Sequence, residues 1–103
     1  MNGARGEVAI SIGGAERPMR LTLGGLAALE ARLGAGGLVE LAERFESGGF
    51  RSGDLIALLA AGLSGAGETV GEDEVATLAF DGGAMGAAEA ACRLLAASFR
   101  GRA

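Results

Sequence analysis

The sequence predicts an α+β fold that is mainly helical, with an N-terminal β-hairpin packed on a small bundle of four to five short helices. Three observations lead to this prediction. Two alternating apolar runs flank Gly13-Gly14, leucine-rich segments with helical spacing follow, and glycine clusters separate those segments. Alternation of apolar and polar residues is typical of a half-buried strand, whereas apolar residues three and four positions apart are typical of an amphipathic helix.

The hairpin is predicted over residues 7–23. Two alternating runs joined by a Gly-Gly pair form a tight hairpin turn. Pro18 has no backbone N–H, so it belongs at a strand start or on a sheet edge. An isolated hairpin is only marginally stable in water, so one face must pack on the helices. The residues expected on that face are Val8, Ile10, Ile12, Met19, Leu21 and Leu23.

The helices are expected over residues 24–33, 37–47, 53–64, 71–80 and 84–99. Ser52 is the expected N-cap of the third helix, and Asp54 follows in the first turn, where the helix dipole favours a carboxylate. For the same reason Glu72-Asp73-Glu74 marks a helix start, after which Val75, Leu78 and Ala79 should face inward. The chain contains no linker long enough to separate two domains, so residues 1–103 are expected to form a single domain.

Two helices contain the candidate partner-binding residues. Residues 55–63 include no charged side chain, so the third helix serves either as the central core helix or partly as an interface. Few positions of a small protein are enclosed on every side, so at least one large side chain of this helix should stay exposed. The candidates on this helix are Leu55, Ile56, Leu58, Leu59 and Leu63.

The last helix supplies the second group of candidates. Met85, Ala88, Cys92, Leu95 and Phe99 follow one another at alternating spacings of three and four, as in a heptad stripe. Two heptads are too few for a coiled coil, so an ordinary amphipathic helix is predicted. Met85, Leu95 and Phe99 are the candidate partner-binding residues here, and Cys92 is expected to be a buried structural thiol.

The residue inventory argues against an enzyme. The chain has no His and no Lys, and Cys92 is its single cysteine. His-activated nucleophiles, zinc sites of His and Cys, and a Lys-containing P-loop are therefore excluded. Gly65-Ala66-Gly67 and Gly62–Ala66 are near matches to a dinucleotide loop and a nucleophile elbow, but both lack the final glycine and are interpreted as helix ends. We expect no catalytic residue, no cofactor and no metal.

Charge and hydropathy restrict the partners further. The formal net charge is −4, and the nine basic residues, all Arg, form no basic face for nucleic acid. The longest apolar stretch is half the length that a membrane span requires, and the N-terminal residues lack the apolar core of a signal peptide. One free cysteine fits the reducing cytoplasm. We expect a cytoplasmic protein that works by protein–protein contact, with homo-oligomers among the candidate assemblies.

Several segments resemble a known family. They are, in chain order, Gly6–Gly14, Arg17–Glu30, Asp54–Leu59 with Gly62-Leu63, Glu72–Val75, and the Ala-rich end through Phe99. The sequence resembles the small tail protein of gene transfer agents, which are phage-like particles of alphaproteobacteria, and the resemblance covers residues 6 to 99. The family is grouped with phage tail assembly chaperones, although some descriptions call it a tail tube protein. Gly71 departs from the pattern, since a small polar helix cap is expected there.

The resemblance implies a tail assembly chaperone that binds the tape-measure protein and/or tail tube subunits during tail morphogenesis. It implies no catalytic residues. Two alternatives remain: a structural tail component retained in the particle, and a generic helical protein-interaction adaptor. A tube subunit fits less well, because such subunits build extended sheets that close into a ring and one hairpin supplies little sheet.

Overall fold

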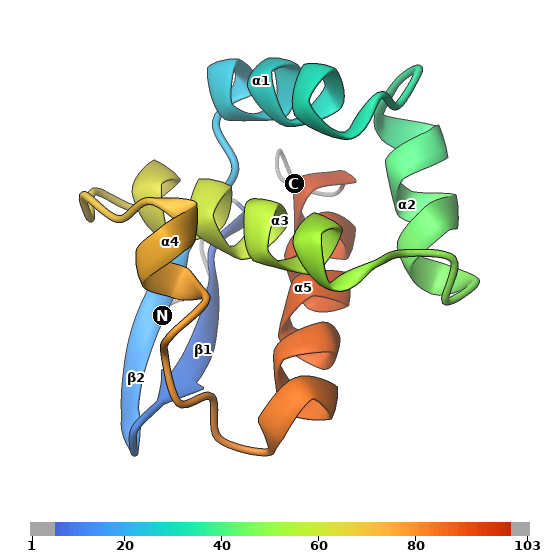
Figure 1. Ribbon diagram of the computed structural model, residues 1–103. Coiled ribbons are helices and arrows are strands. Elements are labelled where there is room, and N and C mark those ends of the chain that lie inside the picture. Colours follow the sequence, from blue (N-terminus) through green and yellow to red (C-terminus); the bar gives the residue numbers. More distant parts are fainter. Residues whose placement is uncertain (1–5, 100–103) are drawn as a thin grey trace.

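The computed structural model describes residues 6–99, without the side chain of Phe99 (Figure 1). Strands β1 (Val8–Ile12) and β2 (Ala15–Met19) form an antiparallel hairpin. The helices that follow are α1 (Leu23–Leu33), α2 (Leu38–Glu46), α3 (Ser52–Gly65), α4 (Glu72–Val75) and α5 (Gly83–Phe99). This order confirms the predicted α+β class. Helix α3 crosses the centre of the molecule and contacts α1, β2, α4 and α5.

The hairpin turn is the one that the sequence predicts. Gly13 and Gly14 have φ angles of 60° and 83°, and a tight two-residue turn of this kind requires positive φ at both positions. Ile12 therefore pairs with Ala15, and the register continues to Val8 opposite Met19. Ile10, Ile12 and Met19 are buried, and Val8 and Leu21 are half-buried against the core, so the inward face is confirmed for these five.

The second strand ends earlier than predicted, and the prediction for Leu23 is wrong. The N–H of Arg20 donates to the carbonyl of Gly62 in α3 at 2.9 Å, so the chain leaves the sheet there. Thr22 then caps α1, because its side chain accepts from the N–H of Gly25 at 2.9 Å. Leu23 is consequently the first residue of α1 and is 84% exposed.

Helix α4 is a single turn, much shorter than the predicted 71–80. Phe80 instead forms a bridge with Ile12, Gly13 donates its N–H to the carbonyl of Ala79, and Asp81 donates to that of Ser11. Hydrogen bonds to the hairpin therefore hold this segment extended. Val75 is buried and Leu78 half-buried, as expected, but Ala79 is exposed and not inward-facing.

The start of α3 also differs from the prediction. Ser52 is the first helical residue, and the N-cap position belongs to Arg51. The Asp54 carboxylate accepts from the N–H of Arg51 at 3.1 Å, which supplies a partner for a backbone group at the helix start. Asp54 thus lies in the first turn as predicted, and it also contributes to the cap.

Glycines in α3 allow the core to close around this helix. A Cβ atom at Gly62 would lie 2.6 Å from Cδ2 of Leu94 in α5 and 3.2 Å from the side chain of Met19 in β2. A Cβ atom at Gly65 would overlap the carbonyl oxygen of Arg20. The hairpin and α5 therefore approach α3 more closely than a larger residue would permit.

Candidate interaction surface

The predicted partner-binding residues of α3 belong mainly to the core. Leu58, Leu59 and Leu63 are at most 1% exposed, and Leu55 and Ile56 are half-buried against the core. Only Leu55 and Ile56 keep part of their surface accessible, so the expectation of an exposed side chain on this helix is met only in part. The reason is the central position of α3, which α1, β2, α4 and α5 all contact. Partner binding by Leu55 and Ile56 stays a prediction.

The candidates on α5 fall into three different environments. Met85 is 76% exposed and Leu95 is buried. Phe99 is the last residue of the helix, and its side chain lies outside the described residues. The buried face of α5 consists of Ala87, Ala90, Ala91, Leu94, Leu95 and Ala97.

The heptad-like stripe is therefore not the centre of the buried face. Ala88 and Cys92 are half-buried at its border. Cys92 was expected to be buried, and it is only partly so. The sequence pattern missed the true face because alanines define it, and alanine alone is a weak signal of burial.

A groove beside α5 brings together residues that the sequence analysis did not combine. It has a volume of about 570 Å³ and is lined by Phe45, Phe50, Met85, Ala88, Glu89, Cys92 and Arg93. We call it the α2–α5 groove. The rings of Phe45 and Phe50 stack with centroids 4.7 Å apart and planes 13° apart. Phe45 is buried and Phe50 half-buried, so the pair extends from the core to the groove.

Phe50 was not predicted as a site residue. It lies in the connection between α2 and α3, directly after Gly48-Gly49. The sequence signal that could have identified Phe50 is a large aromatic residue in a predicted loop, because such a residue must find apolar contacts on neighbouring elements. Its partner Phe45 lies on the buried face of α2.

The environment of Cys92 lowers the reactivity of its thiol. Its Sγ lies 3.9 Å from the carbonyl oxygen of Phe45. Burial raises the pKa of the Cys92 thiol, and the negative charge of Glu46 raises it further. A reactive cysteine needs a lowered pKa, since the thiolate is the nucleophile. The thiol therefore lines the groove as a small apolar group.

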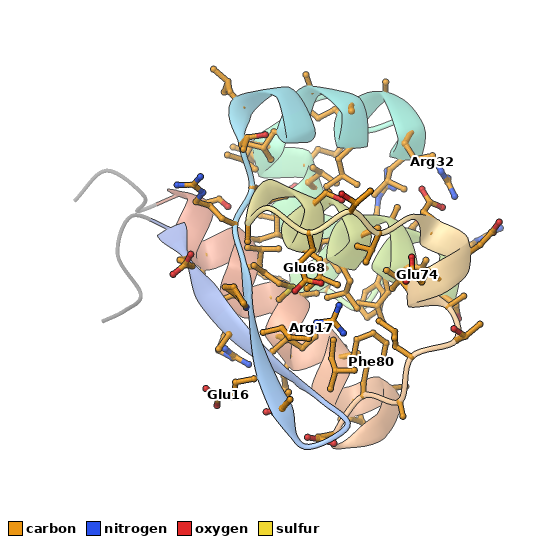
Figure 2. The ribbon with its side chains drawn as sticks, turned by 90° about the vertical axis from the view of Figure 1, so that its left-hand side faces the viewer. Glu16, Arg17, Arg32, Glu68, Glu74 and Phe80 are labelled. Atoms are coloured by element: carbon orange, nitrogen blue, oxygen red, sulfur yellow. The ribbon has the colours of Figure 1, made fainter. Side chains whose placement is uncertain are left out.

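An ion pair fastens the α3–α4 connection to the hairpin. Figure 2 shows Arg17 of β2 and Glu68 pointing toward each other. The Nε of Arg17 donates to Oε2 of Glu68 at 3.2 Å, and Nη2 contacts Oε1. The hydrogen bond from Arg17 lowers the pKa of Glu68. Arg32 and Glu72 form a second, more exposed pair at 2.8 Å.

Both edges of the hairpin are occupied or interrupted. On the β1 edge, Arg93 donates to the carbonyl of Ala9 at 3.2 Å, and Asp81 donates to that of Ser11 at 3.0 Å. Pro18 lies opposite Ala9 in β2 and has no N–H to offer a neighbouring strand. The next N–H that could serve that edge, from Arg20, is bonded to Gly62. A further strand would meet the bonded carbonyls of Ala9 and Ser11 on one edge and an interruption at Pro18 on the other.

These features define a small, mainly helical protein whose accessible apolar surface is suited to protein contact. The chain belongs to the family described as phage tail tube protein, GTA-gp10, whose model matches residues 5–101. This match supports a gene transfer agent or phage tail protein. Comparison with curated proteins and with solved structures found no match.

Over residues 6–99, no group of three or more His, Cys, Asp or Glu side chains is placed to hold a metal ion. Within the same range, no helix is both long and apolar enough to span a membrane.

Proposed function

We propose that the protein is a tail assembly chaperone that acts in the bacterial cytoplasm. It binds the tape-measure protein, the tail tube subunits, or both, while the tail is built. Family membership supports a tail-related role over that of a generic helical adaptor. The proposal includes no catalytic activity, in keeping with a chain that has no His and no Lys.

The observation that carries this proposal is that hydrogen bonds occupy part of one hairpin edge and a proline interrupts the other. A tube subunit that joins its neighbours through a continuous sheet needs strands with free edge groups. The hairpin offers two five-residue strands, with Arg93 and the 79–81 segment on one edge and Pro18 on the other. Natural proteins block edges in these ways to avoid strand-to-strand association. The arrangement favours a protein that stays separate over one that polymerises through its sheet.

Accessible apolar side chains supply contact surfaces for clients. Leu23 of α1, Val39 of α2 and Met85 of α5 are 84%, 62% and 76% exposed. Of these, Met85 lines the α2–α5 groove together with the half-buried Phe50, and a continuous apolar surface of this kind is typical of protein contact sites. The net charge of −4 favours solubility while such surfaces are accessible.

Quantitative mass spectrometry of purified particles tests the proposal. A chaperone is released before the particle is complete, so the protein should be missing from particles in which tape-measure and tube proteins are detected. The control is the lysate before particle purification, in which the protein must be present. In cells lacking the gene, we expect the tape-measure protein to become insoluble.

The second candidate function is a structural tail component. The family description as a tail tube protein favours it. It requires the protein to be present in purified particles at a fixed copy number relative to the tube subunit. That result would contradict the chaperone proposal.

A further inference from the structure

We propose that the α2–α5 groove binds an amphipathic helix of a partner protein whose apolar stripe is flanked by Lys or Arg. This inference rests on the proposed function and specifies both the surface and the chemistry of the client segment. Three properties of the groove carry it: an accessible apolar lining, a negative flank, and a shape bounded by helical elements.

The apolar lining is accessible at its outer end. Met85 is 76% exposed, and Phe50 is half-buried where it stacks on Phe45. Ala88 and Cys92 continue this surface along α5 at spacings of three and four residues. A stripe of this length and spacing matches the apolar face of a partner helix, which places its anchors at the same intervals.

The charges around the groove are mainly negative. Glu89 lines the groove, and the exposed Glu46 of α2 is close enough to influence Cys92. Arg93 is the one positively charged residue of the groove lining, and the hydrogen bond from its Nη1 to the carbonyl of Ala9 directs that side chain toward β1. A partner with Lys or Arg beside its apolar stripe would complement these carboxylates.

The same charges argue against a second copy as the occupant. In a two-fold dimer the same patch faces itself, so the interface would bring together four carboxylates, from Glu46 and Glu89 of each copy, against only two Arg93 side chains. Like charges brought together at an interface are unfavourable. The net charge of each copy is −4, so a second copy also adds to the overall repulsion.

The probe is a labelled synthetic helical peptide with Leu at i, i+3, i+4 and i+7 and Lys at the flanking positions. Its binding to the full-length protein is measured by fluorescence anisotropy. We expect Met85→Arg to weaken binding about tenfold, because it removes an apolar contact and adds a like charge. Glu89→Lys should also weaken binding and make it less dependent on salt.

Leu23→Arg is the matched control. Leu23 is also a highly exposed apolar residue but lies at the start of α1, away from the groove lining. It should leave the affinity unchanged. Circular dichroism should show all three variants folded, since the substituted side chains are exposed.

Cys92 provides an independent readout. It is the single cysteine and lines the groove, so bound peptide should slow its alkylation severalfold, as followed by intact-protein mass spectrometry. Unchanged alkylation, equal effects of Leu23→Arg and Met85→Arg, or equal binding of a peptide with Glu in place of Lys would each overturn the inference.

Three further outcomes are distinguishable. If sedimentation shows a dimer that Met85→Arg dissociates, the occupant is a second copy and the inference is wrong. If the peptide fails to bind while particles lack the protein, the groove inference fails but the chaperone proposal stands. If the peptide binds as expected while particles retain the protein, the chaperone proposal fails instead.

Discussion

Gly65 lies where α3 passes the end of the hairpin, and its missing side chain is what permits this contact. A Cβ there would overlap the carbonyl oxygen of Arg20, a backbone atom that cannot rotate away. We expect Gly65→Ala to lower the free energy of unfolding by about 1–3 kcal/mol through overpacking. Urea denaturation followed by circular dichroism measures this change.

Gly53 provides the control in the same helix. A Cβ there meets nothing within 4 Å, and the residue lies in the first turn of α3. Gly53→Ala should raise stability by about 0.5–1 kcal/mol, because alanine is the better helix former. Equal midpoints for the two variants would show that Gly65 does not lie at a close approach.

The Arg17–Glu68 pair predicts an acid-sensitive contribution to stability. The pKa of Glu68 is lowered from 4.5 in the folded state, so its stabilisation is fully present above that value and is lost as the pH falls through the folded-state pKa. We expect Glu68→Gln to be less stable than the unaltered protein by about 0.2–1 kcal/mol at pH 7, the range for partly exposed pairs.

Thermal melts across pH measure this effect. The difference between the two proteins should shrink below pH 4.5, where the carboxylate becomes protonated, and should also shrink in high salt. A difference that stays constant from neutral to acid pH would contradict an electrostatic role for Glu68.

At the scale of elements, the hairpin is held against the helices by the burial of one of its two faces. Ile10 is 3% exposed and belongs to the core. Ile10→Asp should strongly destabilise the fold, since an unpaired carboxylate in apolar surroundings costs several kcal/mol or becomes neutral by raising its pKa.

Ala15→Asp is the control, because Ala15 is an exposed position of the same hairpin. Its effect should stay within about 0.5 kcal/mol. Differential scanning calorimetry compares the two, and an unchanged melting temperature for Ile10→Asp would refute the assignment of the inner face.

The elements that sequence predicted well are those with local signals. The Gly13-Gly14 turn and the apolar spacings of α1, α2 and α3 depend on residues close together in the chain. The end of α4 was missed because Phe80 is held by a bridge to Ile12, a distant partner that no local pattern reveals. Likewise, Leu23 continues the alternation of apolar and polar residues in the sequence, but in the structure Thr22 caps α1 and the helix begins at Leu23.

At the scale of the whole molecule, burial depends on which element lies in the centre. A small protein was expected to leave part of α3 exposed, but Leu58 and Leu63 are fully buried because four other elements contact that helix. The sequence predicted only part of the groove lining: Met85 was a candidate partner-binding residue, whereas Phe50 was not. The groove lies beside α5 because α2 packs against α5 there. The residue pattern of either helix alone does not specify this packing.

The contact between β1 and α5 sets the order in which the protein can fold. Arg93 donates to the carbonyl of Ala9, 84 residues earlier in the chain, and α5 packs on the same strand. During translation, Ile10 and Ile12 emerge from the ribosome early, but the helix that covers β1 emerges last among the described elements. The nascent chain therefore holds an apolar strand without its cover until synthesis has passed α5, so we expect native structure to form late, when the contacts of longest sequence separation can close.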